Sequence, residues 1–419
     1  MIMKAKEILM SKRIHNIFYS SLLIACLFLA PPAGALTYHV EIMDLDAGQP
    51  MTPPVVTVHE DGYHLFELGS QASMGLQQLA EDGMTMALLE EANMSGHVHH
   101  AMVGGSAPTF ASFKFLIQAE PGDLFSFASM FAKTNDVFVG VSAVPLPESP
   151  LEMDAMAYDA GTEVNTGMMA HIPAYGNVGV GEDEDNPIAE INSYAVVDDP
   201  DQGMIEYSWP PAAKVMITPM PDAVEYKVTM NGLSDGQPLT PPLIAIHDES
   251  VSVYEMGEQA STGLEMLAEE GATDTLKMEL LSMDGVWNVY IGGDAPGFEQ
   301  MTTLIAEPGQ RISIVSMFAR TNDVFTGVAG AMLPQAGAPL AIETNAYDAG
   351  TEMNTGMMAH IPAYGNAGGP DEDGTVMEIN SYTVVDDPDG QLDYTWPPAA
   401  MIEIEGMGMQ SHVSHWDLY

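Results

Sequence analysis

The chain is organised around a loop-like stretch of twenty residues that occurs twice. Residues 158–177 read YDAGTEVNTGMMAHIPAYGN and residues 347–366 read YDAGTEMNTGMMAHIPAYGN, so that only Val164 against Met353 differs. Asp, Gly, Thr, Glu and Asn so close together disfavour helix and strand and favour a loop. Their carboxylate and amide oxygens suit a hard cation such as calcium, but the same residues also build tight turns without a ligand. From this stretch alone, both interpretations stay open.

Matched segments on both sides of this stretch show that the whole chain is a duplication. The matched pairs are 45–54 with 233–242, 134–138 with 321–325, 197–201 with 385–389, and 209–211 with 396–398. Their offset stays between 187 and 189 residues, whereas a solenoid would repeat every 20–50 residues or so. We therefore predict two tandem domains over residues 36–217 and 223–405, with a linker over 218–222 and a tail over 406–419.

Each copy reads mostly as strands. Residues 38–42 and 226–230 alternate between apolar and polar side chains, as half-buried strands do. Turn signals recur every 10–15 residues, which favours a sandwich over βαβ units. One short helix is expected in each copy, over residues 72–83 and 260–271, and each ends at a glycine.

The composition is that of an acidic globular protein. Hydrophobic residues make up 46% of the chain, which is ordinary for a folded protein and too high for a disordered one. The 11 Lys and Arg residues face 59 Asp and Glu residues, for a net charge of −48. Nucleic acid and anionic membranes need a basic face, so the charge argues against both as partners. Cations, cationic surfaces or a saline medium fit the charge better.

The first 35 residues have the pattern of an export signal. Basic residues precede an apolar run from Ile17 to Ala30, and residues 33–35 (AGA) form a cleavage site of the A-x-A type. The run is short for a membrane span. The only cysteine, Cys26, follows Leu-Ile-Ala as in a lipoprotein box, so lipid anchoring through Cys26 is the alternative to simple secretion. We expect a secreted or cell-surface protein without a membrane span.

The shared motifs resemble the spondin domain of the F-spondin type. GQPxTPP, NDxFxGV and YDAGTE follow one another in the same order in both copies. The resemblance covers nearly all of both copies and implies two tandem C2-like antiparallel β-sandwiches, an all-β fold, each with a short helix. It also implies calcium held by loops at one end of each sandwich, and extracellular adhesion rather than catalysis.

The resemblance also assigns metal ligands by position, with one calcium ion per domain. The implied ligands are Asp136, Asp159 and Glu163 in the first copy and Asp323, Asp348 and Glu352 in the second. Carboxylates with carbonyls and water suit calcium, whereas structural zinc prefers Cys and His. Carboxylates this close repel one another unless a cation lies among them.

Two histidine groups allow a second metal hypothesis. His97, His99 and His100 have no histidine at the matching positions of the second copy, which favours an exposed strand end. His171 and His360 recur beside methionine pairs, a combination that suits copper but more often marks packed side chains. The repeated Asp-Asp-Pro-Asp segments do not have EF-hand spacing and favour solvated turns.

Three common catalytic motifs are absent from the sequence. It has no H-E-x-x-H, no P-loop and no dinucleotide fingerprint. We therefore predict a non-enzymatic, secreted, calcium-binding adhesion or extracellular-matrix-type binding module. Its partner would be an unidentified glycan or protein of a cell surface or matrix. A structural component of a cell envelope or extracellular layer is the alternative, and a hydrolase with paired carboxylates is a distant one.

Overall fold

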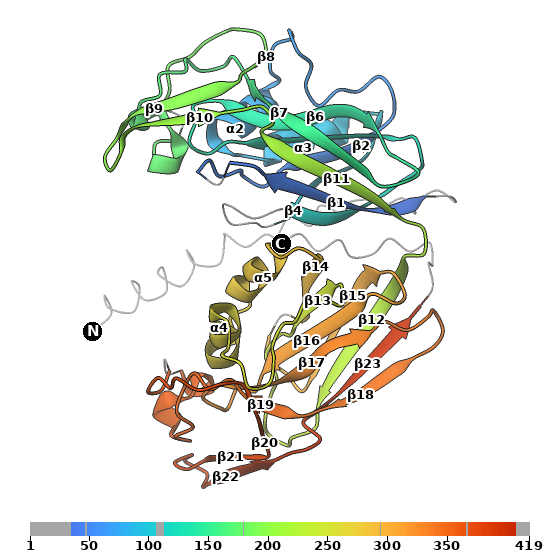
Figure 1. Cartoon of the computed structure of the whole chain (residues 1–419), viewed down its shortest axis with the longest axis vertical. Coiled ribbons are helices and arrows are strands. Elements are labelled where there is room, and N and C mark those ends of the chain that lie inside the picture. Colours follow the sequence, from blue (N-terminus) through green and yellow to red (C-terminus); the bar gives the residue numbers. More distant parts are fainter. Residues whose placement is uncertain are drawn as a thin grey trace, which may run out of the picture.

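The computed structural model describes residues 35–46, 48–105, 113–178, 180–293, 295–365 and 368–407. The predicted export signal with Cys26 lies outside these ranges, as does most of the predicted tail. Figure 1 shows two domains stacked along the long axis of the molecule, the first above and the second below. No helix in the described ranges is both long enough and apolar enough to cross a bilayer.

The first domain is a sandwich of antiparallel strands. Its main strands are β1 (Leu36–Asp44), β2 (Val55–His59), β3 (Val98–Val103), β4 (Phe113–Ala119), β5 (Leu124–Met130), β6 (Val137–Pro145), β7 (Leu151–Asp159), β8 (Ala189–Glu190) and β11 (Ala213–Met220). They join in the order β3-β2-β5-β6-β7-β11-β1-β4, with β8 beside β7. A separate ribbon is formed by β9 (Ser193–Asp199) and β10 (Gly203–Ser208).

The second domain repeats this arrangement with one strand broken in two. Its strands are β12 (Val224–Gly232), β13 (Leu243–His247), β14 (Val286–Ile291), β15 (Glu299–Ala306), β16 (Arg311–Met317), β17 (Val324–Met332), β18 (Leu340–Thr344), β19 (Ala346–Asp348), β20 (Met377–Ile379), β21 (Ser381–Val384), β22 (Leu392–Thr395) and β23 (Ala400–Gly406). The counterpart of β7 is split into β18 and β19, so the sheets β14-β13-β16-β17-β19-β20 and β15-β12-β23-β18 are separate. The ribbon β21-β22 corresponds to β9-β10. The predicted all-β tandem fold is confirmed.

Apolar side chains of alternating strand positions fill the space between the two halves of each sandwich. In β12, Tyr226, Val228 and Met230 are buried and their neighbours along the strand are partly exposed. The same period-two pattern predicted this strand from the sequence. The buried residues of β12 share one core cluster with Ile244 of β13 and Ile314 of β16.

Two short helices cover the outer side of the β2-β5-β6 part of the first domain. They are α2 (Met74–Asp82) and α3 (Met86–Met94), and the second domain has α4 (Thr262–Glu270) and α5 (Asp274–Leu281) at the same places. Ser73 caps α2 by accepting the Leu76 N–H, and Gly83 ends the helix in the left-handed conformation. The helix predicted in each copy is therefore present, and each copy has a second helix that the sequence analysis missed.

The two helices of each pair cross at a glycine. A Cβ atom added to Gly75 would lie 2.5 Å from the Leu88 Cα, because α2 and α3 touch backbone to backbone there. The Glu91 carboxylate of α3 accepts the Gly75 N–H at 2.7 Å and the Ser73 hydroxyl at 2.5 Å. Side chains of the chain itself therefore satisfy the start of α2.

A buried histidine and serine hold a bulge between β5 and β6. The Ser126 Oγ lies 2.8 Å from the His59 Nε2 and accepts the Ala143 N–H at 2.8 Å. Ala143 is left-handed, with φ of 56°, which costs an L-residue with a Cβ atom free energy. The second domain makes the same contacts with His247, Ser313 and Gly330.

We expect Ala143→Gly to stabilise the first domain by about 1 kcal/mol, because glycine adopts this conformation without the Cβ clash. Urea unfolding with a fixed m-value would measure the gain. The reverse change, Gly330→Ala, should destabilise the second domain by a similar amount. A loss of stability in Ala143→Gly would contradict the strain at this bulge.

The two domains contact each other through different surfaces. Lys114 of β4 is 6% exposed and donates to the backbone carbonyls of Met283 at 2.8 Å and Val286 at 2.9 Å, in the turn between α5 and β14. Its ammonium also lies 3.4 Å from the Glu41 carboxylate. The chain passes between domains in a short turn over 221–223, because β11 continues to residue 220.

Candidate functional site

The duplicated loop places two aspartates side by side at one end of each sandwich. Asp136 ends the turn before β6, and Asp159 is the last residue of β7. Val137 pairs with Asp159 in the sheet, so the two acids come from adjacent strands. Val324 pairs with Asp348 in the same way, which brings Asp323 and Asp348 together in the second domain.

Asp136 is fully buried and only one of its carboxylate oxygens has hydrogen-bond donors. Its Oδ2 accepts the backbone N–H groups of Thr162 at 2.7 Å and Glu163 at 2.9 Å. Its Oδ1 is buried without a hydrogen-bond partner. Burial, and then the charge of Asp159, raise the pKa of Asp136 to about 7. Burying an acceptor without a donor costs free energy, so we expect this oxygen to bind a proton or a cation.

The second domain reproduces this arrangement. The Asp323 Oδ2 accepts the N–H groups of Thr351 and Glu352, each at 2.9 Å, and its Oδ1 is also buried without a partner. Burial, and then the charge of Asp348, raise the pKa of Asp323 to about 7. The same buried, unpaired oxygen occurs in two domains that differ at many other positions. Its recurrence indicates that it belongs to the arrangement that the two domains share.

The partner aspartate is held by its own loop. The Asp159 Oδ1 accepts the Gly161 N–H at 2.7 Å, and its Oδ2 accepts the Asn165 side-chain amide at 2.5 Å. Burial raises the pKa of Asp159 in spite of these two hydrogen bonds. Asn165 was not among the predicted site residues, although its identity in both copies was a signal that could have marked it.

The third predicted ligand of each set is placed differently. The Glu352 backbone contacts Asp323, but its carboxylate accepts the Gly369 N–H at 2.6 Å and the Asn322 amide at 3.3 Å. In the first domain, burial and then the charge of Glu81 raise the pKa of Glu163 to about 7. Among the described residues, no three His, Cys, Asp or Glu side chains converge as a metal-binding group.

The residues present fit a hard cation on the chemistry of their donors. The two aspartates of each site offer only oxygen, and one oxygen is buried and unpaired. Calcium prefers carboxylate, carbonyl and water oxygens. The side chains that could hold such an ion are Asp136 with Asp159, and Asp323 with Asp348.

The repeated histidines and Asp-Asp-Pro-Asp segments take part in fixing the loop. The His171 Nδ1 lies 3.0 Å from the Thr166 hydroxyl. The Asp198 Oδ1 accepts the Met169 N–H at 2.7 Å, where the short helix η1 (Met169–His171) begins. The Asp199 carboxylate accepts the Tyr175 hydroxyl at 3.0 Å, in η2 (Pro173–Tyr175). η3 (Met358–His360) and η4 (Pro362–Tyr364) are the counterparts in the second domain.

Two histidines of the first domain, His97 and His99, contact separate acids. The His97 Nδ1 lies 2.9 Å from the Glu60 carboxylate, and the His99 Nδ1 lies 3.4 Å from Asp123. Both histidines are about half exposed. These are separate, exposed side-chain contacts, which contribute little to stability.

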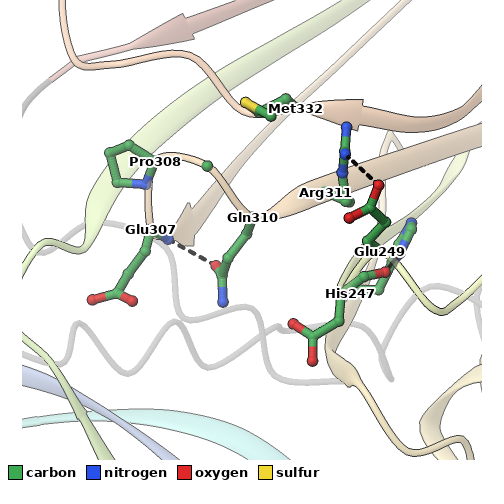
Figure 2. Close-up of a pocket in the computed structure, with 9 residues that line it drawn as sticks. His247, Glu249, Glu307, Pro308, Gln310, Arg311 and Met332 are labelled. Carbon is green, nitrogen blue, oxygen red and sulfur yellow. Dashed lines mark hydrogen bonds and ion pairs between the residues drawn. The ribbon is translucent and has the colours of Figure 1, made fainter.

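The second domain has a pocket where β16 begins (Figure 2). It is lined by His247, Asp248, Glu249, Glu307, Pro308, Gly309, Gln310, Arg311 and Met332. Arg311 begins β16, whereas Asp323 follows the other end of that strand. The Arg311 guanidinium contacts Glu249 at 3.2 Å, and the Gln310 side chain accepts the Glu307 N–H.

Comparison with known proteins identifies the repeated domain. The Spondin_N family matches the chain twice, over residues 51–174 and 238–363. The first match contains Asp136, Asp159 and Glu163, and the second contains their counterparts. A search of curated proteins found no match. Because the two matches together cover more than half of the chain, this protein belongs to the Spondin_N family.

Proposed function

We propose that the protein is a secreted, non-catalytic binding module in which each domain holds one calcium ion. Spondin_N domains are non-enzymatic modules of an extracellular-matrix type. The observation that carries the calcium proposal is the buried, unpaired oxygen of Asp136 and of Asp323, each beside a second aspartate. The binding partner would be a glycan or protein of a cell surface or matrix, and the export signal would be removed after residue 35.

A calcium ion would supply the positive charge that lets both aspartates of a site ionise near neutral pH. Asp136 and Asp159 would hold it in the first domain, and Asp323 and Asp348 in the second. Glu163 and Glu352 are the third proposed ligands. A carboxylate of this length can bind calcium through both oxygens, once it exchanges its asparagine and glycine contacts for the ion.

Calcium should therefore raise the stability of the protein by binding only the folded state. At a calcium concentration of about 100 times Kd, each site would add about 2.7 kcal/mol to the unfolding free energy. Extracellular sites are often weak, with Kd on the order of 10⁻⁴–10⁻³ M, so millimolar calcium is needed. Calorimetric unfolding with calcium or with a chelator, at fixed high ionic strength, measures the effect without general screening of the −48 charge.

Variants of single residues show which domain binds each calcium ion. Asp159→Asn keeps the side-chain size but removes a carboxylate, and should reduce the bound calcium from two ions to one. Asp348→Asn should do the same for the second domain, and Glu163→Gln tests the third ligand. The matched control is Asp61→Asn, because Asp61 is an exposed turn residue far from the site in sequence. Equal melting temperatures of the wild type with calcium and with chelator, together with no calcium by elemental analysis, would refute the calcium proposal.

A further inference from the structure

Three exposed apolar residues lie along the backbone near Gly167, two in the duplicated loop and one on the neighbouring strand β9. A Cβ atom on Gly167 would lie 3.3 Å from a Val197 methyl carbon, and the Val197 N–H donates to the Gly167 carbonyl at 2.8 Å. Met168 follows Gly167 directly, and the Thr166 N–H donates to the Val164 carbonyl. We call Val164, Met168 and Val197 the apolar patch of the first domain.

The second domain has an apolar patch at the same place, around Gly356. The exposed fractions are 37% for Val164, 37% for Met168 and 48% for Val197 in the first domain, and 52% for Met353, 39% for Met357 and 52% for Val385 in the second. The one difference between the duplicated stretches, Val164 against Met353, therefore exchanges one exposed apolar side chain for another.

The apolar patch is apolar at all three positions in both domains and identical at two of them, where packing alone does not require identity. Residues 197–201 and 385–389 have the same sequence, as the 158–177 stretch and its copy nearly do, and these segments meet in space. The intervening residues 178–192 and 367–380 differ in length and sequence. Core packing explains identity of buried residues, but exposed methionine and valine have no core to fill. Recognition of the same partner group by both domains would account for them.

The rim of the apolar patch carries two carboxylates in each domain, and a cation lies near the second of them: Lys133 near Asp199, and Arg320 near Asp387. Asp198 and Asp199 follow Val197 directly, and Asp386 and Asp387 follow Val385. Apolar surface next to carboxylates is complementary to a segment that presents apolar side chains beside Lys or Arg. Methionine makes such a surface adaptable, because its side chain is flexible and polarisable. An anionic lipid surface is not complementary to this rim, because both carry negative charge.

We propose that the apolar patch of each domain binds a basic, amphipathic segment of a partner protein, so that one chain offers two equivalent docking sites. This inference rests on the proposed binding function and gives the chemistry of the partner. The ribbons β9-β10 and β21-β22 that carry Val197 and Val385 lie far apart along the long axis of the molecule (Figure 1). Two partner segments can therefore bind at once.

A synthetic amphipathic peptide of leucine and lysine, labelled for fluorescence anisotropy, tests this proposal on the full chain in calcium and high salt. We expect two peptides per chain for the wild type, one for Met168→Asp or Met357→Asp, and binding about tenfold weaker or absent for the double variant. Each substitution adds a negative charge, which would strengthen binding by charge alone, so a loss identifies the apolar contact. A peptide with serine in place of leucine should not bind.

The matched control is Met86→Asp combined with Met94→Asp, because both methionines are exposed on the helix pair α2-α3. This control should keep the wild-type affinity. Should the Met168→Asp variant fail to fold, Val197→Thr with Val385→Thr keeps the strand and should bind several-fold more weakly. All patch variants should keep the calcium-dependent rise in melting temperature. That readout separates failure of the patch from failure of the calcium proposal.

Several results would overturn the proposal. One is equal peptide affinity in the wild type and the Met168→Asp, Met357→Asp double variant. Another is a wild-type dimer in sedimentation that the double variant does not form, since the patch would then bind a second copy. A third is binding to phosphatidylcholine vesicles that the double variant loses, since lipid would then be the partner.

Discussion

Replacing Lys114 by methionine is expected to lower the unfolding free energy by about 3 kcal/mol. Methionine keeps most of the apolar stem but removes the ammonium group. The carbonyls of Met283 and Val286 then lose their donor, and the Glu41 carboxylate loses its nearest cation. Removing one partner of a buried ion pair typically costs about 3–5 kcal/mol, because the other charge stays buried and unpaired. We take the lower end, since the Glu41 side chain is 12% exposed.

Lys227→Met is the matched control for this effect. Lys227 lies on β12, the second-domain counterpart of β1, and is partly exposed. Its replacement should change stability by less than about 0.5 kcal/mol. Urea unfolding of both variants, with limited proteolysis at the turn over 221–223, would show whether the domains separate in Lys114→Met. Equal stabilities of the two variants would mean that the buried ammonium does not hold the domains together.

Substituting alanine for Gly75 is expected to destabilise the first domain by about 3 kcal/mol. The added Cβ atom would lie 2.5 Å from the Leu88 Cα and 2.6 Å from its nitrogen, so that α2 and α3 must move apart. Overpacking of this kind typically costs about 1–3 kcal/mol, and backbone atoms cannot yield as a side chain can. Thermal and urea unfolding should show the loss in the first domain while the second is unchanged.

Substitutions at two further glycines test whether the close crossing of the helices causes this loss of stability. Gly263→Ala should transfer the loss to the second domain, because its Cβ atom would lie 2.4 Å from the Leu276 Cα. Gly96→Ala is the control, since nothing lies within 4 Å of its Cβ position. It should be neutral or slightly stabilising through the unfolded chain. A loss in Gly96→Ala as large as in Gly75→Ala would show that helix crossing is not the cause.

Local signals predicted the duplication, the strands and the first helix of each domain. The second helix, α3, was missed because its apolar residues do not keep to one face. The Thr85 side chain at its start makes no capping hydrogen bond. In contrast, α2 has Ser73 at its start and Gly83 at its end, both readable from the sequence.

The candidate site was predictable as a set of residues but not as a geometry. The sequence marked Asp136, Asp159 and Glu163, but the pairing of Val137 with Asp159 is a long-range contact. That pairing, rather than chain proximity, brings the two aspartates together. Nor does the sequence show that neighbouring backbone and amide groups engage the Glu163 carboxylate. The interdomain role of Lys114 was also hidden, because its partners are carbonyls of the other domain.

The contact made by Lys114 also shows how the two domains are related in space. It joins a sheet face of one domain to a turn of the other, and the reciprocal surfaces stay uncovered, as the 53% exposure of Met301 on the equivalent face shows. A two-fold axis would bring the same surface of both domains together, so no such axis relates them. The two domains therefore repeat in sequence, but they are arranged head to tail rather than symmetrically. A dyad-symmetric partner cannot engage both halves equivalently, whereas a flexible or repetitive ligand can.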